Sequence, residues 1–404
     1  MSIGIITVGN ELLTGYIDDT NAAWLGREIT ALGEQPAWHL TVGDDPQAIV
    51  SALTAVPNDV TDVIITGGLG PTHDDITLQT VSDFFGIKLE FDQDYWGELC
   101  RRFERRGYPV PEINRNQALV PQATEIIPNP VGSARGALFW QADRRYYILP
   151  GVPMEMKAMF TATIAAKIRP PAVTTVIRAV RTTGIMESSL AELLGNLHND
   201  FPAVTLAFLP RLSGLDLRLI GHDPAEVDKF IEKIVERAGK YIYGYDEIKL
   251  EEVVGRLLTR HGLTIATAES CTGGLISHRL TQVAGSSNYL LGGIVAYSND
   301  VKIDLLGVRP ETLAIHGAVS EETAREMAAG VREKLGADIG LATTGIAGPG
   351  GGTVAKPVGL VYIGLAYRER VVVRKMQFIY NRQVNKRLSS QVALNMVRIE
   401  LENA

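Results

Sequence analysis

A polar stretch in the last third of the chain carries the residue types of a nucleophilic reaction centre. In AESCTGG (268–274), Glu269, Ser270 and Cys271 stand next to one another ahead of two glycines. The apolar run before them predicts a strand and the residues after them predict a helix, so Ser270 falls at the corner between the two. N–H groups in such a turn can bind a phosphate or stabilise an oxyanion. Ser270 is therefore either a nucleophile or only the N-cap of the next helix.

A serine nucleophile needs a base, and a lysine is the best candidate here. None of the histidines after residue 250 lies in a glycine-flanked polar cluster, which argues against a Ser-His-Asp triad. GGIVAYSNDVK (292–302) instead places Tyr297 at a predicted strand end and Lys302 on the next turn. Partial burial can lower the pKa of a lysine far enough for the amine to accept a proton. The alternative is that Lys302 is a solvated lysine on a helix.

Two further features bear on this centre. TTGIAGPGGG (343–352) follows a third predicted strand, with hydroxyls and a flexible loop that could bind an anion or could do no more than form a turn. Cys271 is expected one residue into the next helix, with its side chain turned toward the sheet, where it would be a small packing residue. If this stretch holds a nucleophile, Ser270 is therefore a better candidate than Cys271.

Polar loops also follow predicted strands near the N-terminus. GNELLTG (9–15) comes after the first strand and TGGLGPTHDD (66–75) after the third. In parallel α/β sheets, ligands bind beyond the carboxyl ends of the strands, where glycines let N–H groups approach a phosphate. Asp74 and Asp75 are hard oxygen ligands that would suit Mg²⁺ or a similar cation beside a pyrophosphate. The alternative is that they cap the helix that follows.

Alternating strands and helices are needed to position these loops. The sequence predicts such an alternation in two regions of the chain. We predict an α/β protein: two α/β domains with largely parallel sheets, joined by a small α+β module. The pair Pro170–Pro171 suggests the first boundary. The predicted domains are residues 1–171, 172–245 and 246–404.

The composition and net charge argue against several classes of protein. The chain has 404 residues, a net charge of −7 and only two cysteines. The acidic balance argues against a general nucleic-acid binder, and the cysteine count excludes a disulfide framework. The sequence shows no signal peptide and no apolar run long enough for a membrane span, so we expect a cytoplasmic protein without a membrane partner.

The C-terminal motifs resemble those of a known family. AESCTGGL, GGIVAYSNDVKIDLLGV, GAVSEETAREMAAGVRE, TTGIAGPGGG and KPVG are similar to the C-terminal domain of the CinA family (competence/damage-inducible protein A). That domain is similar to bacterial amidases that convert nicotinamide mononucleotide to nicotinate mononucleotide and ammonia. The resemblance implies a cofactor-free amidase with Ser270 as nucleophile, Lys302 as its base, and Tyr297 and Thr344 in the site. The implied substrate contacts are Glu269, Thr272, Gly273, Gly274, Gly345, Gly348, Gly350 and either Arg382 or Arg387.

The N-terminal motifs resemble the first domain of the same family. GNELLTG, DTN, TGGLGPTHDDIT, NRNQA, NPVGSARG and LPGVPMEM are similar to its molybdopterin-binding (MoaB/Mog-like) fold. In that family the domain is linked to metal-dependent ADP-ribose pyrophosphatase activity, with pterin or nucleotide binding without turnover as the alternative. The implied ligand contacts are Glu11, Asn21, Gly67, Gly68, Gly70 and Thr72. The implied ligands of a divalent Mg, Mn or Co ion are Asp74, Asp75 and Glu155.

The middle module resembles the KH-type insert of this family. A nucleic-acid-binding KH domain clamps backbone phosphates with a Gly-x-x-Gly loop. The corresponding stretch here, TTGIMES (182–188), lacks the second glycine. We therefore expect a structural or dimerisation module, a homodimeric chain and no specific nucleic-acid partner. A non-catalytic scaffold in DNA uptake is the remaining alternative.

Overall fold

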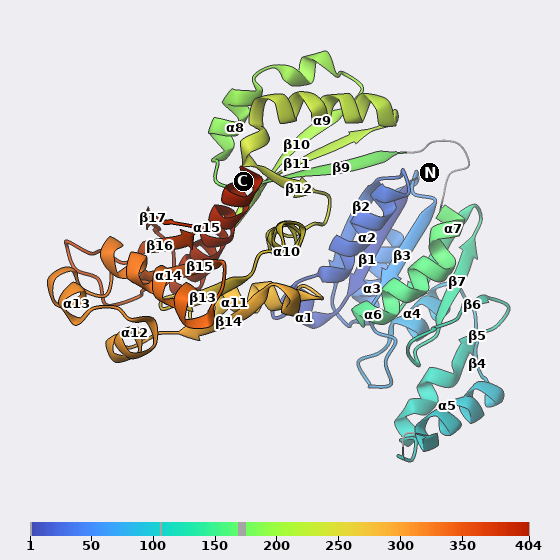
Figure 1. Ribbon diagram of the computed structural model, residues 1–404. Coiled ribbons are helices and arrows are strands. Elements are labelled where there is room, and N and C mark those ends of the chain that lie inside the picture. The colour runs from blue at the N-terminus through green and yellow to red at the C-terminus, as the bar shows by residue number, and fades with distance from the viewer. Residues whose placement is uncertain (1, 106, 169–174, 404) are drawn as a thin grey trace. The chain divides into compact units, whose positions relative to one another are not determined.

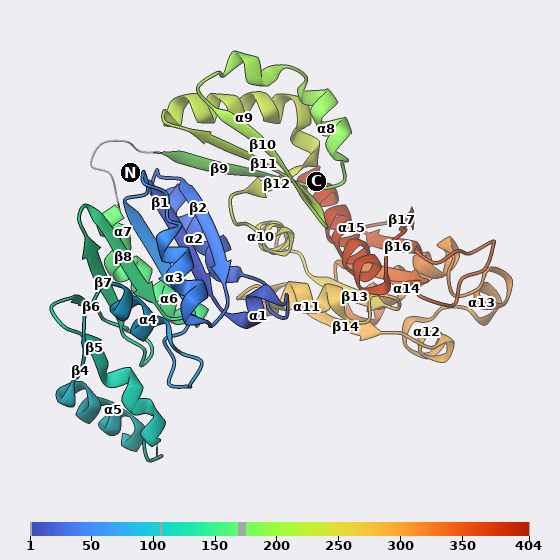
Figure 2. The same cartoon turned by 180° about the vertical axis from the view of Figure 1, so that it is seen from behind.

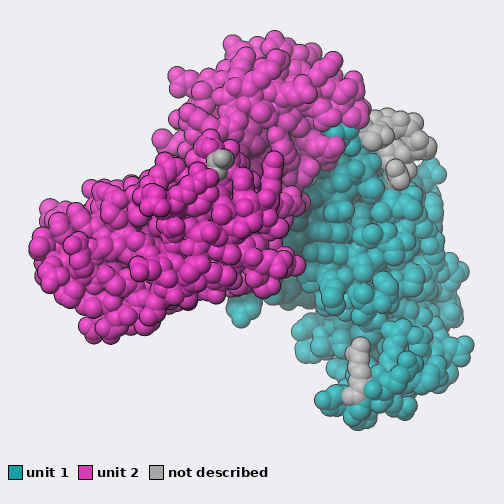
Figure 3. Space-filling view, viewed as in Figure 1, with its two compact units in different colours: residues 1–176 teal, residues 177–404 magenta. Residues whose placement is uncertain are grey.

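The chain folds into two compact units, residues 1–176 and 177–404, which are coloured separately in Figure 3. The computed structural model describes residues 2–105, 107–168 and 175–403. The boundary expected at Pro170–Pro171 lies outside these ranges. Within them, no helix is long and apolar enough to cross a membrane.

The first unit is built on a six-stranded mixed sheet. Its order is β2 (Pro36–Val42), β1 (Ile3–Val8), β3 (Asp62–Thr66), β8 (Arg144–Leu149), β7 (Gly136–Gln141) and β6 (Glu125–Ile127). The first four strands run parallel, whereas β7 and β6 are antiparallel to their neighbours.

Helices cover both faces of this sheet, as Figures 1 and 2 show. The apolar run of β1 explains why, because Ile3 and Ile5 point into one core while Ile6 and Val8 point into the other. A strand buried on both faces needs such a continuous apolar run. The covering helices are α2 (Thr20–Ala31), α6 (Pro153–Met159) and α7 (Ala165–Ile168) on the first face and α3 (Pro46–Thr54) and α4 (Thr77–Phe84) on the second.

A small lobe of the first unit was not predicted. It consists of the two-stranded sheet β4 (Leu89–Phe91) and β5 (Leu119–Pro121) together with α5 (Gln93–Arg105). Each of its strands is only three residues long. A segment this short cannot show the alternation of apolar and polar residues that predicts a strand.

The second unit begins with the expected α+β module. Its antiparallel sheet has the order β10 (Thr205–Arg211), β11 (Gly214–Gly221), β9 (Val176–Thr182) and β12 (Ile242–Tyr245). Helices α8 (Glu187–Leu194) and α9 (Pro224–Ala238) pack on it. Helix α9 ends at Ala238, and Ile242 begins the edge strand β12.

The rest of the second unit is a three-layer α/β structure. Its sheet has the order β14 (Leu290–Val295), β13 (Ile265–Glu269), β15 (Ile339–Gly345), β16 (Leu360–Tyr367) and β17 (Arg370–Gln377). One face is covered by α10 (Leu250–His261), α11 (Leu275–Thr281) and α15 (Arg382–Glu402), the other by α12 (Asn299–Leu306) and α14 (Glu321–Leu335). The α/β class is confirmed, although β16 and β17 are antiparallel, so this sheet is mixed as well.

Helix α14 lies unusually close to its neighbours because glycines leave room for it. A Cβ atom on Gly330 would lie 1.7 Å from the carbonyl oxygen of Leu306, at the end of α12. A Cβ on Gly340 of β15 would lie 2.0 Å from the carbonyl oxygen of Ala328. Backbone atoms cannot move aside as a flexible side chain would, so both positions require glycine.

We predict that Gly330→Ala destabilises the second unit by about 1–3 kcal/mol, because the added methyl group forces α14 away from α12. Thermal unfolding should then shift downward by roughly 2–4 °C per kcal/mol. Gly239→Ala is the matched control, since its Cβ would lie at an ordinary 3.6 Å from the nearest Val235 carbon and its φ is −52°. Equal melting temperatures for the two variants would contradict this account.

Candidate active site

The ends of β13, β14 and β15, in the five-stranded sheet of the second unit, meet at one pocket of about 220 Å³. Glu269, the last residue of β13, pairs with Val295 of β14 on one side and Thr343 of β15 on the other. The residues that follow these three strands therefore meet at one edge, as the sequence predicted. The pocket is lined by Ser270, Cys271, Tyr297, Asn299, Lys302, Ala318, Val319, Thr344, Gly345, Ala347 and Arg382.

The two predicted reacting groups lie together in this pocket. The Nζ atom of Lys302 is 3.2 Å from the Oγ atom of Ser270. Lys302 is only 1% exposed and Ser270 9% exposed, so the pair is largely shielded from water. Lys302 is therefore not the solvated helix lysine that was the alternative.

Burial shifts the protonation equilibrium of this lysine toward the neutral amine. It lowers the pKa of the Lys302 ammonium, and only a thiolate at Cys271 would oppose that shift. Burial also raises the pKa of the Cys271 thiol to about 12, so no thiolate is present at neutral pH. The amine also donates to the carbonyl oxygens of Ala296 at 2.8 Å and Tyr297 at 3.4 Å. A neutral amine can make both bonds and still direct its lone pair at the Ser270 hydroxyl.

The turn after Ser270 differs from the prediction. Helix α11 begins at Leu275 and not at Cys271, because Gly273 and Gly274 adopt positive φ angles of 60° and 90° that end the turn before the helix starts. Ser270 is consequently not the N-cap of α11. The N–H group of Thr272 has no backbone acceptor among the described residues, whereas that of Cys271 contacts the thiol of its own residue. The N–H group of Thr272 is free to donate to a developing oxyanion.

Two predicted substrate contacts have structural roles instead. Glu269 is fully buried, and its carboxylate accepts from the N–H groups of Ile276 at 3.0 Å and Ser277 at 2.8 Å, which holds the first turn of α11. Thr272 is also fully buried and shares a hydrogen bond of 2.7 Å with the hydroxyl of Thr343. The substrate-binding role predicted for Glu269 and Thr272 is therefore corrected to support of the turn.

The rim of the pocket carries the predicted arginine. Arg382 donates from one nitrogen to the Tyr297 hydroxyl and from the other to the carbonyl oxygen of Gly348, both at 2.9 Å. Thr344 lines the wall and donates to the carbonyl oxygen of Ala318 at 2.5 Å. Gly345 also lines the pocket, whereas Gly350 has open space around it and lies outside the lining.

Arg387 is the predicted contact that the structure places elsewhere. It lines a different pocket, of about 830 Å³, together with Arg279 and Lys249. Of the two predicted arginines, Arg382 is the one that lines the 220 Å³ pocket. Asn299, Ala318 and Val319 are lining residues that the prediction missed, although they stand in the motifs that indicated the site.

The first unit has its own pocket at the predicted strand ends, of about 240 Å³. Gly68, Gly70 and Thr72 line it, as predicted. The lining residues that the prediction did not single out are Asn116, Gln117 and Arg135, which belong to two of the motifs quoted for this domain. Arg135 brings a cation to the glycine-rich loop, which suits an anionic ligand.

Three predicted ligand contacts lie outside this pocket. Gly67 has a φ of 117°, and a Cβ there would lie 2.1 Å from the carbonyl oxygen of Val8, so it is needed for the close approach of two strand ends. Asn21 is buried and donates to the carbonyl oxygen of Gly151 at 2.8 Å. Glu11 is exposed on the short helix α1 (Asn10–Leu13).

The three carboxylates predicted to hold a metal ion are not assembled for it. Asp75 uses both oxygens to accept from the N–H groups of Gly70 at 2.7 Å and Thr72 at 2.8 Å, which shapes the loop. Asp74 is exposed and paired with a neighbouring histidine. Glu155 accepts from the amide of Asn129 at 2.6 Å. Across the described ranges, no group of three or more His, Cys, Asp or Glu side chains could hold an ion, so these residues do not form a ready cation site.

The alternative that Asp74 and Asp75 cap the next helix is wrong, whereas their role as metal ligands stays a prediction. Helix α4 begins at Thr77 after Ile76 and has no side-chain cap. Both carboxylates come too early in the chain to cap it, and Asp75 organises the glycine-rich loop instead.

Comparison with known proteins identifies the family. The domain described as "CinA C-terminal domain" matches residues 247–401, "Damage-inducible protein CinA KH domain" matches 177–244, and "Probable molybdopterin binding domain" matches 4–170. A CinA-like protein of Chloroherpeton thalassium is 44% identical over 99% of both chains. This chain belongs to the CinA family. A second CinA-like protein, of Salinibacter ruber, is 42% identical over 98% of this chain and 99% of its own.

Solved structures related to this CinA-family chain cover parts of it. The competence/damage inducible protein CihA from Agrobacterium tumefaciens is 43% identical and covers 38% of this chain and 97% of its own, with a TM-score of 0.37. MoaB from Thermus thermophilus is 18% identical and covers 42% of this chain and 96% of its own, with a TM-score of 0.28. All residues that line the 220 Å³ pocket lie within the CinA C-terminal match.

Proposed function

We propose that the C-terminal pocket is an amidase site that hydrolyses nicotinamide mononucleotide to nicotinate mononucleotide and ammonia. The observation that carries the proposal is the 3.2 Å contact between the Ser270 hydroxyl and the buried Lys302 amine. A hydroxyl beside an amine of lowered pKa is the arrangement that nucleophilic acyl transfer requires. The nucleotide substrate is taken from the resemblance to the nicotinamide-nucleotide amidases.

The reaction proceeds in two half-steps. Lys302 takes the Ser270 proton while Oγ attacks the carboxamide carbon, and the negative charge on the carbonyl oxygen is stabilised by the N–H group of Thr272. The ammonium of Lys302 then returns its proton to the leaving nitrogen, and ammonia departs. In the second half-step Lys302 takes a proton from water while the water oxygen attacks the nicotinoyl ester. The Lys302 ammonium then protonates Oγ of Ser270 as the ester C–O bond breaks, and the acid product loses its proton to solvent and leaves as the carboxylate.

Arg382 is the side chain best placed to hold the phosphate of such a substrate. It lines the pocket at its rim, and its planar guanidinium suits a phosphate. The substrate would displace the present bonds of Arg382 to Tyr297 and Gly348 or share them. No step of this mechanism needs a metal ion.

Replacing Ser270 and Cys271 one at a time should show which of the two is the nucleophile. We expect Ser270→Ala to lower kcat for ammonia release from nicotinamide mononucleotide on the order of 10⁴-fold or more, because no other group can form the acyl intermediate. Cys271→Ala should keep kcat at the same order, since the thiol is buried and uncharged. A coupled ammonia assay on both purified variants, with thermal melts to show folding, measures this. Retained activity in Ser270→Ala together with its loss in Cys271→Ala would overturn the assignment.

The pH dependence should report the buried amine. Protonated Lys302 cannot accept the Ser270 proton, so kcat/KM should rise with pH and level off once Lys302 is neutral. Because burial lowers this pKa, the rise should end below the ordinary lysine value of about 10.4. Lys302→Arg should be inactive across the range, since arginine stays protonated. A profile that still rises above that value would contradict a lowered pKa at Lys302.

A second function is proposed for the first unit, that of binding a nucleotide or pterin phosphate. It is supported by the 240 Å³ pocket where Gly68, Gly70 and Thr72 face Arg135. Turnover of ADP-ribose with a divalent ion remains the finer proposal, although the loop role of Asp75 gives no ready ligand set. The expected homodimer and cytoplasmic location also remain predictions.

Removing the metal ion tests whether the first unit only binds ADP-ribose or also hydrolyses it. We expect ADP-ribose to bind with or without metal, and Arg135→Gln to weaken binding about tenfold or more because it removes a charged contact. Calorimetry after chelation measures binding, and phosphate-product analysis with Mg²⁺, Mn²⁺ or Co²⁺ measures hydrolysis. Binding that disappears with the metal would contradict the metal-free pocket and favour the pyrophosphatase.

A further inference from the structure

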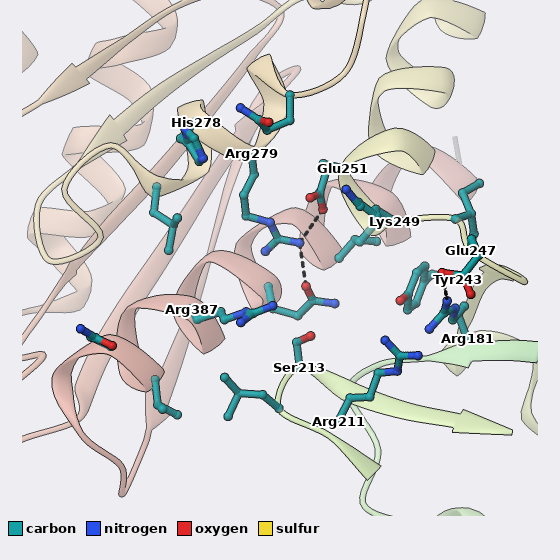
Figure 4. Close-up of a pocket in the computed structure, with 18 residues that line it drawn as sticks. Arg181, Arg211, Ser213, Tyr243, Glu247, Lys249, Glu251, His278, Arg279 and Arg387 are labelled. Carbon is teal, nitrogen blue, oxygen red and sulfur yellow. Dashed lines mark hydrogen bonds and ion pairs between the residues drawn. The ribbon is translucent and has the colours of Figure 1, made fainter. Parts of the chain in front are cut away.

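A second pocket of the second unit lies apart from the proposed amidase site. It has a volume of about 830 Å³ and is formed by strands of the middle module together with helices α11 and α15 (Figure 4). Ligand sites typically measure about 300–1,000 Å³, so this pocket can take a whole small molecule. None of the residues around it lines the 220 Å³ pocket.

Cationic side chains from five places in the chain converge on this pocket. They are Arg181 of β9, Arg211 of β10, Lys249 ahead of α10, Arg279 of α11 and Arg387 of α15. Only two carboxylates, those of Glu247 and Glu251, line it as well. This positive balance stands out in a chain whose net charge is −7.

Part of the cluster is held rigidly. Arg181 is only 4% exposed and is fixed by Asp216 at 2.5 Å. Arg279 is bound by Glu251 at 2.7 Å and by the side-chain oxygen of Gln391 at 2.8 Å. Donors that are already oriented lose little entropy when a ligand binds.

Two other cations have no such partner. In the part of the chain that the structure describes, Lys249 and Arg387 form no ion pair, and both are exposed to the pocket. Figure 4 shows them on different walls, with the paired Arg279 nearby. An anion between them would gain contacts that the protein itself does not supply.

We propose that this pocket binds a phosphorylated small molecule that carries more than one phosphate, such as a nucleoside diphosphate. A ligand with two phosphates can place one at Lys249 and the other at Arg387, the two cations without an ion-pair partner, which lie on different walls of the pocket. Tyr243 and Leu212 also line the pocket and offer an aromatic ring and an apolar surface to the rest of the ligand. This site would be separate from the amidase chemistry and from the pocket of the first unit.

A small molecule fits these observations better than a nucleic acid. The stretch 182–188 lacks the second glycine with which KH domains clamp a backbone. The acidic chain as a whole would also repel a long polyanion, whereas a compact ligand meets only the local positive charge.

The test measures protection of Lys249 in the full-length protein. The chain is acylated with N-hydroxysuccinimidyl acetate at increasing ADP concentration, and each lysine is quantified by mass spectrometry. We expect ADP and inorganic pyrophosphate to protect Lys249 saturably, and adenosine not to protect it. Exposed Lys334 of α14, outside the pocket, should react equally throughout.

Matched variants locate the bound ligand. Arg387→Gln should raise the ADP concentration needed for half-protection about tenfold or more, because a charge-assisted contact is lost. Arg256→Gln on α10 removes the same charge from an exposed position outside the pocket and should leave protection unchanged.

Three results would overturn the proposal. The first is equal reactivity of Lys249 with and without ADP. The second is unchanged protection in Arg387→Gln, which would mean that ADP acts from another site. The third is tighter, steeply salt-dependent protection by a single-stranded oligonucleotide, which would make the pocket part of a nucleic-acid surface.

Discussion

The burial of one amine beside one hydroxyl is the constraint on which the C-terminal site depends. A charged lysine without a carboxylate partner is expensive to bury, so the surroundings of Lys302 favour its neutral form. Carbonyl oxygens of Ala296 and Tyr297 satisfy its N–H groups, which leaves the lone pair for Ser270. The same burial raises the pKa of the Cys271 thiol to about 12 and so keeps it protonated.

In the turn after Ser270, groups other than the Ser270 hydroxyl accept the N–H groups at the N-terminus of helix α11. The Glu269 carboxylate accepts the first N–H groups of α11, on the side of the turn away from the pocket. Gly273 and Gly274 allow the chain to reach that helix through positive φ angles. The N–H group of Thr272 consequently has no backbone acceptor among the described residues.

Helix α15 lines both the 220 Å³ pocket and the 830 Å³ pocket. Arg382 and Arg387 are five residues apart, which places them about 140° apart around the helix axis. One therefore reaches the rim of the 220 Å³ pocket while the other lines the 830 Å³ pocket. Gln391, further along the helix, binds Arg279 and also donates to Thr183 of the middle module at 3.3 Å. The middle module thus contributes walls to a pocket, in keeping with a structural role.

The sequence alone was enough for the α/β class, most of the strands and helices, and the pairing of Ser270 with Lys302, because strand periodicity and polar strand ends are local signals. It could not assign Glu269, Thr272 or Arg387, since the direction of a side chain depends on where the helix begins and on its rotation against the sheet. It also could not show that Asp75 is committed to the loop of Gly70 and Thr72. The roles of these residues depend on contacts between distant segments and on the backbone angles of the turns. Both are set only when the chain folds.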